Sequence, residues 1–181
     1  MKKKLAWKLL RSEEGLDLRI AKLRFDWWQN PRNGTELKAT VLEISDWVNI
    51  VALTPEDKIL VVKQFRLGTQ LVTTETPAGI MEAGEDPKDA AIRELAEETG
   101  YTTDDWTYLG SVEPNPAFQD NHCHQFLAKG VVCTQDVNQD DGEDVEFCEM
   151  TLDEVKEEIK AGRMRNSLSL LTLSRVFDIW K

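Results

Sequence analysis

The sequence predicts an α/β domain that follows an N-terminal antiparallel β-meander. Short runs rich in β-branched residues alternate with turn signals along much of the chain, and a central segment carries both a helix start and a helix stop signal. The 181 residues, 41% of them hydrophobic, suffice for one compact domain with a substantial core and an N-terminal extension. We therefore divide the chain into a meander at residues 1–45 and a main domain at residues 46–181.

The first half of the chain contains several segments that are expected to form strands. A β-forming stretch at Leu16–Trp28 is followed by the turn Asn30–Gly34 and by an alternating stretch at Leu37–Ile44. Two β-branched runs come next, Val48–Leu53 and Lys58–Phe65. Runs of this kind suit a sheet that is covered on both faces. These segments predict a meander followed by the central strands of the main domain.

The central helix is predicted from its boundary signals. Asp86 is a suitable N-cap, and Pro87 fits the first helical position. Lys88–Thr99 contains no helix breaker, and Gly100 supplies a residue that readily adopts the left-handed conformation at a helix end. These signals predict a helix of about three turns, at 3.6 residues per turn.

The rest of the chain continues the α/β pattern. Strands are predicted at Trp106–Val112 and His124–Val132, and an acidic loop at Asp136–Glu146. A capping box at Thr151–Glu154 predicts the start of one helix, and Ser167–Trp180 predicts a second.

Overall composition limits the classes of partner. Acidic residues outnumber basic ones 33 to 22, which gives a net charge of −11, so a nucleic acid would be repelled. The three cysteines form no CxxC pair, which fits a reducing compartment, and we expect a cytoplasmic protein. The longest apolar runs are strand-sized, so no membrane partner is expected. An acidic chain can still bind a phosphate-bearing small molecule when divalent cations lie between the carboxylates and the phosphates.

One side of the central helix carries carboxylates that repel one another. Glu94, Glu97 and Glu98 stand at positions i, i+3 and i+4, toward the end of the helix where the dipole disfavours negative charge. Each unfavourable term is a few tenths of a kcal/mol, up to about 1. Arg93 borders this stripe, but we expect no basic residue four positions away to relieve it. A hard divalent cation would relieve it, whereas an ordinary solvated acidic face is the alternative. The opposite side is expected to carry Ile92, Leu95, Ala96 and Thr99.

The residues around this stripe match a known motif. Gly79–Tyr101 resembles the Nudix box, GX5EX7REUXEEXGU, at every specified position except the last, where Tyr101 replaces the usual aliphatic residue. The chain is thus similar to the Nudix hydrolases. This resemblance implies the Nudix α/β/α sandwich, in which a mixed sheet lies between helices.

The resemblance also implies a set of metal ligands. In Nudix hydrolases the carboxylates of REUXEE bind the metals, so Glu94, Glu97 and Glu98 are the expected ligands, with Glu98 bridging two ions and acting in catalysis. Glu85 is a further candidate, acting through water or through the box arginine. The backbone carbonyl before the first box glycine, that of Ala78, is expected to complete the set. These oxygen ligands suit Mg²⁺, with Mn²⁺ as an alternative.

A catalytic base is expected outside the box. In the ADP-ribose pyrophosphatase branch, a glutamate on a loop after the box positions or deprotonates the attacking water. The matching region here is the acidic loop, in which Glu143 is the first candidate and Glu146 the second. An ordinary solvated acidic turn is the alternative for this loop.

Residues beyond the box resemble one branch of the family, roughly from Asp46 to Ala128. Gln64–Arg66 followed by Glu75–Gly79 is similar to the QYR and ELPAG pattern of ADP-ribose and nucleoside-diphosphate-sugar pyrophosphatases, and Pro116 matches a further marker of that branch. A proline-rich turn at the end of a strand is the alternative for Pro116.

Several side chains are therefore candidate substrate contacts. Arg66 could bind a diphosphate with its planar donors, or form a salt bridge to Glu75. Phe118, near Pro116, is a further candidate contact, as is Glu75 itself.

The adjacent Trp27 and Trp28 face opposite sides of a strand, so one of them could stack on a nucleobase. Core or interface packing is the alternative for either. In this branch the N-terminal meander usually exchanges between subunits and the partner contributes to the base pocket, which implies a homodimer.

The resemblance as a whole implies Mg²⁺-dependent hydrolysis of a pyrophosphate. The expected substrate is ADP-ribose or another nucleoside diphosphate sugar, and the expected products are a nucleoside monophosphate and a sugar phosphate. The alternatives are a Nudix pyrophosphatase acting on GDP-mannose, dinucleoside polyphosphates or coenzyme A, and, from a different class, a non-catalytic nucleotide sensor.

Overall fold

The computed structural model describes residues 5–138 and 144–181. The chain forms two compact units, one of residues up to Ser45 with Glu113–His122 and the other of Asp46–Val112 with Cys123–Lys181. The segment 113–122 falls inside the range expected for the main domain, yet it groups with the N-terminal unit. The reason is backbone hydrogen bonding, because the N–H of Leu42 donates to the carbonyl of Phe118 at 2.7 Å.

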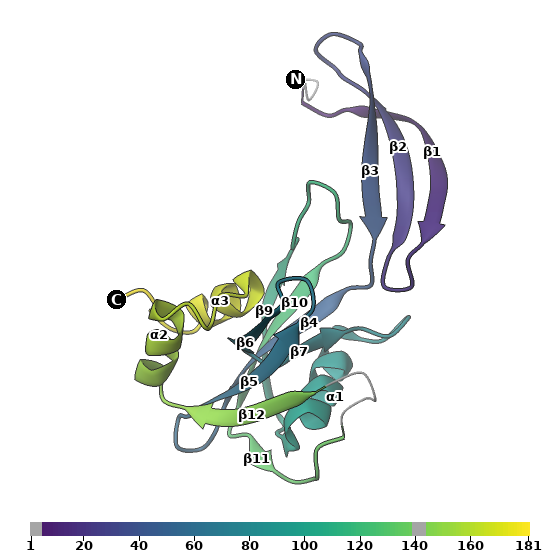
Figure 1. The fold of residues 1–181 in the computed structure, drawn as a ribbon. Coiled ribbons are helices and arrows are strands. Elements are labelled where there is room, and N and C mark those ends of the chain that lie inside the picture. The colour runs from purple at the N-terminus through teal and green to yellow at the C-terminus, as the bar shows by residue number, and fades with distance from the viewer. Residues whose placement is uncertain (1–4, 139–143) are drawn as a thin grey trace. The chain divides into compact units, whose positions relative to one another are not determined.

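The N-terminal unit is an antiparallel three-stranded sheet in the order β1-β2-β3 (Figure 1). The stretch expected as one strand at Leu16–Trp28 is divided, because the chain turns between β1 and β2 with Arg19 at a φ of 69°. The sequence pattern did not reveal most of β1, because its residues are all exposed and show no alternation between buried and exposed positions. The strands are β1 (Lys8–Asp17), β2 (Lys22–Gln29) and β3 (Glu36–Glu43).

The larger unit contains a seven-stranded mixed sheet. Its order is β12-β5-β4-β10-β9, with β6 paired to β5 and β7 paired to β4. The β4–β10 ladder is parallel and the other ladders are antiparallel, which confirms the expected mixed sheet. The strands are β4 (Trp47–Leu53), β5 (Ile59–Arg66), β6 (Leu71–Glu75), β7 (Ala78–Ile80), β9 (Asp105–Val112), β10 (Cys123–Lys129) and β12 (Val145–Met150).

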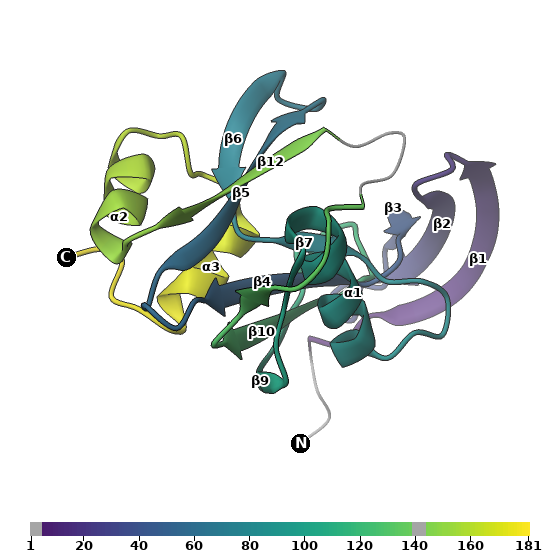
Figure 2. The same ribbon diagram turned by 90° about the horizontal axis from the view of Figure 1, so that it is seen from below.

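Helices cover both faces of this sheet (Figures 1 and 2). Successive side chains of a strand point to opposite faces, so β4 contributes to two separate cores. Val48 and Ile50 pack with residues of α1 (Pro87–Thr99), including Leu95. Val51 packs on the other face with residues of the segments that hold α2 (Leu152–Lys160) and α3 (Ser167–Ser174), including Val155 and Leu173. The α/β/α arrangement expected from the sequence is confirmed.

The ends of α1 agree with the sequence signals. The side chain of Asp86 accepts a hydrogen bond from the backbone N–H of Lys88, and Pro87 occupies the first helical position. Gly100 ends the helix at a φ of 75°, and its N–H donates to the carbonyl of Ala96 at 2.8 Å. Both caps therefore satisfy backbone groups that the helix leaves free.

Two predicted boundaries differ from the observed ones. The strand expected at His124–Val132 ends at Lys129, because Gly130 adopts a φ of 62° and turns the chain; β11 (Val132–Cys133) then pairs with β8 (Tyr101–Thr102). The last helix ends at Ser174 rather than at Trp180, and the chain turns at Val176, whose N–H donates to the carbonyl of Leu173.

The expected acidic loop is shorter than predicted. Val145–Met150 pairs in register with β5, so Glu146 belongs to β12 and lies opposite Lys63. Among the helices of the described residues, none is long and apolar enough to cross a membrane.

We predict that Gly100→Ala lowers the free energy of unfolding by about 2 kcal/mol or more. A left-handed conformation costs a residue with a side chain roughly 1–2 kcal/mol, and the added Cβ would lie 2.3 Å from the carbonyl oxygen of Gln135. Urea unfolding measures the change. Gly84→Ala is the matched control, because Gly84 also has a positive φ but a Cβ there meets no atom within 4 Å. Equal losses in the two variants would contradict the close approach at Gly100.

Candidate active site

The carboxylates of α1 are turned toward the protein. Glu94 is 8% exposed and Glu98 is 3% exposed, whereas Glu97 is partly buried. Ile92, expected on the apolar side, is exposed instead. The stripe is therefore not an ordinary solvated face. It packs near β7, and this burial makes the repulsion between its charges more costly.

Arg93 links four groups of the box. Its guanidinium donates to the carboxylate of Glu85 at 3.0 Å through both Nε and Nη2. Its Nη1 donates to Glu94 at 2.8 Å and to Glu97 at 3.0 Å. Its Nη2 also donates to the backbone carbonyl of Ile80 at 3.1 Å. Arg93 stands four positions before Glu97, so the expectation that no basic residue at that spacing relieves the stripe is wrong.

These contacts shift two ionisation equilibria. The hydrogen bonds from Arg93 hold the pKa of Glu85 below its ordinary value. The hydrogen bond to Glu85, followed by those to Glu94 and Glu97, raises the pKa of Arg93 above its ordinary value. The cation is therefore permanent at any working pH, and it neutralises part of the carboxylate cluster.

The backbone of β7 lies against the same carboxylates. A Cβ at Gly79 would lie 1.8 Å from Cδ of Glu94, so only glycine leaves room for that carboxylate. The N–H of Ala78 donates to Oε2 of Glu98 at 3.1 Å. Ala78 and Gly79, at the start of β7, thus lie against the two buried glutamates. The contact of Ala78 is made by its N–H, and the role of its carbonyl as a metal ligand stays a prediction.

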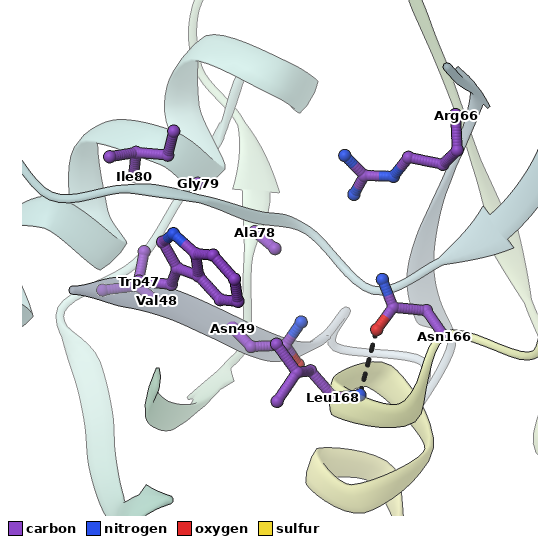
Figure 3. Close-up of a pocket in the computed structure, with 9 residues that line it drawn as sticks. All are labelled: Trp47, Val48, Asn49, Arg66, Ala78, Gly79, Ile80, Asn166 and Leu168. Atoms are coloured by element: carbon purple, nitrogen blue, oxygen red, sulfur yellow. Dashed lines mark hydrogen bonds between the residues drawn. The ribbon is translucent and has the colours of Figure 1, made fainter. Parts of the chain in front are cut away.

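A cavity of about 280 Å³ adjoins β7 (Figure 3). The ladder between β4 and β5 pairs Leu53 with Ile59; further along, β4 pairs with β7 and β5 pairs with β6. Residues from these diverging strands and from the start of α3 line the cavity. They are Trp47, Val48, Asn49, Arg66, Ala78, Gly79, Ile80, Asn166 and Leu168.

Arg66 forms the salt bridge to Glu75 that the sequence left open as one alternative. Its Nε and Nη2 donate to the two carboxylate oxygens at 2.8 and 2.7 Å. Glu75 is 1% exposed and also accepts hydrogen bonds from Thr73 and Asn166. Burial raises the pKa of Glu75, but the hydrogen bonds from Arg66 and Thr73 outweigh it and hold the pKa below its ordinary value. The buried carboxylate therefore orients Arg66, whose guanidinium points toward the cavity (Figure 3).

Among the described residues, no contact joins a candidate catalytic base to the carboxylate cluster of α1. Glu143 lies outside the described residues. Glu146 is exposed on β12, and among the described residues no hydrogen bond connects it to the carboxylates of α1.

The remaining substrate candidates belong to the N-terminal unit. Trp27 lies under two cations, with Arg11 at 3.9 Å and Lys38 at 4.8 Å from its ring centre. Trp28 is partly buried on β2, and Pro116 and Phe118 are exposed in the segment that joins this unit.

Of the residues that line the cavity, only Arg66 and Ala78 were predicted from the sequence as site residues. The cavity is also lined by Trp47, Asn49, Asn166 and Leu168, among others. A usable signal existed for the first two, because an asparagine interrupts the otherwise apolar run Val48–Leu53 and the tryptophan two places earlier shares its face. No local signal connected α3 with the box.

The arrangement suits a divalent cation chemically. Carboxylate and backbone oxygens are the ligands that Mg²⁺ prefers, and Glu94, Glu98 and the backbone of Ala78 lie around one short stretch of β7. Among residues 5–138 and 144–181, no group of three metal-binding side chains is preformed. Arg93 occupies the carboxylates of Glu94 and Glu97 instead.

Comparison with known proteins identifies the family. The model of the NUDIX domain matches residues 46–171. The chain therefore belongs to the NUDIX domain family, and the expected class of enzyme, a Nudix pyrophosphatase, is confirmed.

Individual relatives agree with this assignment. The chain is 35% identical over 167 residues to the "Methanol dehydrogenase activator" of Bacillus methanolicus, covering 92% of this chain and 90% of that protein. It is 38% identical over 123 residues to the "ADP-ribose pyrophosphatase" of Bacillus subtilis (strain 168), covering 67% and 66%. A solved structure described as "Crystal structure of ADP compounds hydrolase" superposes with a TM-score of 0.81 at 19% identity, covering 94% and 91%. This last likeness supports the fold alone.

We predict that Gly79→Ala lowers the affinity for Mg²⁺ or Mn²⁺ at least about tenfold, the scale on which displaced metal-site contacts act. The new Cβ would displace the carboxylate of Glu94. Isothermal titration with either cation measures the effect. Gly68→Ala is the control, because a Cβ at Gly68 meets no atom within 4 Å. An unchanged cation affinity in Gly79→Ala would contradict a metal role for Glu94.

Proposed function

We propose that this chain is a Mg²⁺-dependent hydrolase that cleaves the pyrophosphate of ADP-ribose or another nucleoside diphosphate sugar. The observation that carries the proposal is the pair of buried carboxylates, Glu94 and Glu98, held on the backbone of β7 beside the cavity into which Arg66 points. The products are a nucleoside monophosphate and a sugar phosphate.

Glu94, Glu97, Glu98 and the backbone carbonyl of Ala78 would hold the cation, with Mn²⁺ as an alternative to Mg²⁺. Such a cation supplies charge neutralisation for phosphate oxygens and activation of water. Glu85 acts on the site through Arg93, whose two hydrogen bonds to it keep the guanidinium in place.

Arg66 provides a permanent positive charge at the cavity. Its bidentate contact with Glu75 fixes the plane of the guanidinium, which reduces the conformational entropy lost when it meets a phosphate. Glu75 contributes by orienting Arg66 rather than by touching the substrate.

A carboxylate outside the box accepts the proton of the attacking water in this proposal. Glu143 is the first candidate for this role and Glu146 the second. Trp27, Trp28, Pro116 and Phe118 remain candidate contacts with a nucleotide.

Relatives support the choice of substrate class. The Bacillus subtilis relative is named an ADP-ribose pyrophosphatase. The Bacillus methanolicus relative, which matches more of the chain, bears a name that describes an effect on another enzyme. GDP-mannose, dinucleoside polyphosphates and coenzyme A are the alternative substrates, and a nucleotide sensor without catalysis is the alternative function.

We further propose that the protein is a cytoplasmic homodimer that binds neither nucleic acid nor membranes. Within the described part of the N-terminal unit, Ala21 is the one buried apolar residue. Leu9, Trp28 and Leu37 face one another across the three strands and form an apolar row. Leu9 and Leu37 are exposed, so a second copy could cover this row.

We predict that Glu98→Gln lowers Mg²⁺-dependent hydrolysis at least about 100-fold, because loss of even an outer contact of a metal site costs 10–100-fold. A panel of ADP-ribose, sugar nucleotides, dinucleoside polyphosphates and coenzyme A, followed by phosphate release after phosphatase coupling, measures turnover. Glu149→Gln is the control, because Glu149 lies on β12 and bonds Tyr101 instead of the cluster. Binding of ADP-ribose without hydrolysis, unchanged in Glu98→Gln, would favour the sensor.

We predict a solution mass of twice 20.7 kDa by light scattering. The double variant Leu9→Glu, Leu37→Glu should shift the protein to monomer, because it places charges on both sides of Trp28 in the apolar row. Leu171→Glu, at an exposed position on α3, is the control and should leave the mass unchanged. A monomeric wild-type protein would contradict the dimer.

A further inference from the structure

Trp47 and Asn49 occupy one face of β4 at the edge of the cavity. They are two positions apart on the strand, so both side chains point to the same side of the sheet. On β7 their backbone partners are Ile80 and Ala78, next to the residue that contacts the buried carboxylate of Glu94. Figure 3 shows the indole of Trp47 and the amide of Asn49 side by side in the cavity.

Asn49 presents a side-chain hydrogen-bond donor that bonds to no other residue in the part of the chain that the structure describes. The residue is 1% exposed, and its Oδ1 accepts a hydrogen bond from Oγ1 of Thr76 at 2.9 Å. That contact fixes the amide so that Nδ2 faces the cavity (Figure 3), and this nitrogen donates to none of the described residues. Nδ2 is not among the solvent-inaccessible side-chain atoms that lack a partner in the described residues, so it is open to the cavity and can donate to a molecule bound there. The position therefore favours a ligand with an acceptor atom at this depth.

The rest of the cavity wall suits a flat apolar group. Trp47, Leu168 and Ile80 supply an indole face and two aliphatic side chains. Pockets for whole small molecules usually measure about 300–1,000 Å³, so a cavity of about 280 Å³ holds one part of a nucleotide substrate. An aromatic ring with acceptor atoms on its edge fits both the stacking surface and the free donor of Asn49.

The charged groups lie beside this stacking surface, where the phosphate of a nucleotide would lie if its base occupied the cavity. The guanidinium of Arg66 points toward the cavity, and Gly79 lines the cavity while its missing Cβ leaves room for Glu94. A group that is planar and apolar at one end and anionic at the other matches this order. Trp27, one of the two tryptophans that the sequence indicates for stacking on a base, already carries cations over its ring.

We propose that Trp47 and Asn49 form a nucleobase subsite, in which the base stacks on the indole and accepts a hydrogen bond from Nδ2 of Asn49. The ligand class is a nucleoside phosphate, and the subsite determines specificity for its base. The identity of the reaction at the neighbouring carboxylates rests on the proposed function, but the binding of the base does not.

Titration calorimetry with AMP and with ribose 5-phosphate, both in the presence of Mg²⁺, tests the subsite on the intact protein. Stacking of one base on an aromatic side chain is worth roughly 1–3 kcal/mol, so Trp47→Ala should weaken AMP binding about tenfold or more. Trp47→Phe should restore most of it. Asn49→Ala and Asn49→Asp should both weaken AMP binding, because neither side chain can donate. Ribose 5-phosphate binding should stay unchanged in all four variants.

Trp180→Ala is the matched control, because Trp180 is 67% exposed and does not line the cavity. Thermal unfolding of each variant identifies any that fail to fold. If Trp47→Ala fails to fold, Trp47→Phe is used to test the subsite. In that case the conservative variant should shift the ranking of AMP, GMP, CMP and UMP affinities.

Three results would overturn the subsite. They are wild-type protein that binds AMP no more tightly than ribose 5-phosphate, equal losses for the two ligands in Trp47→Ala, and a loss of AMP binding in Trp28→Ala with none in Trp47→Ala. Failure of the proposed function is distinguishable, because it appears as absence of hydrolysis by the wild-type protein and leaves the AMP titration interpretable.

Discussion

The site depends on the contact between α1 and the backbone of β7. Glu94 lies where a side chain of Gly79 would otherwise be, and Glu98 accepts a hydrogen bond from Ala78. Arg93 completes the contact by bonding both Glu94 and the carbonyl of Ile80. Burial of two carboxylates would be unfavourable without these donors and this cation, because charges need partners away from water. The helix and the strand therefore hold the carboxylates in one place.

The divergence of β4 and β5 creates the cavity that lies beside the carboxylates and forms the other part of the site. Where the two strands part, β7 and β6 take over their edges and a cavity remains between them. A buried network at Glu75 fixes Arg66 at this cavity, with Thr73 and Asn166 bonded to the same carboxylate. Groups from three separate parts of the chain thus act on one small volume. A rigid sheet and buried hydrogen bonds reduce the entropy that binding must otherwise overcome.

Local signals predicted much of the fold. Both ends of α1 follow from Asp86 and Gly100, because caps depend on residues adjacent in sequence. Boundaries were less accurate where the chain turns without a strong signal, as at Arg19, and where an exposed strand shows no alternation. The relief of the acidic stripe by Arg93 was also missed. An arginine side chain is long enough to reach groups on both sides of its own position, and its direction depends on what it can bond.

The sequence by itself determined the box that carries the carboxylates and, through it, the family, because the box depends on residues close together in the chain. The mixed α/β architecture followed from the resemblance to that family. Tertiary structure alone decided that Glu94 and Glu98 are buried and that Arg66 is bonded to Glu75. It also decided that Trp47 and Asn49 share a cavity with Leu168 of α3. Strand register and helix packing bring distant residues together, and neither can be inferred from spacing along the chain.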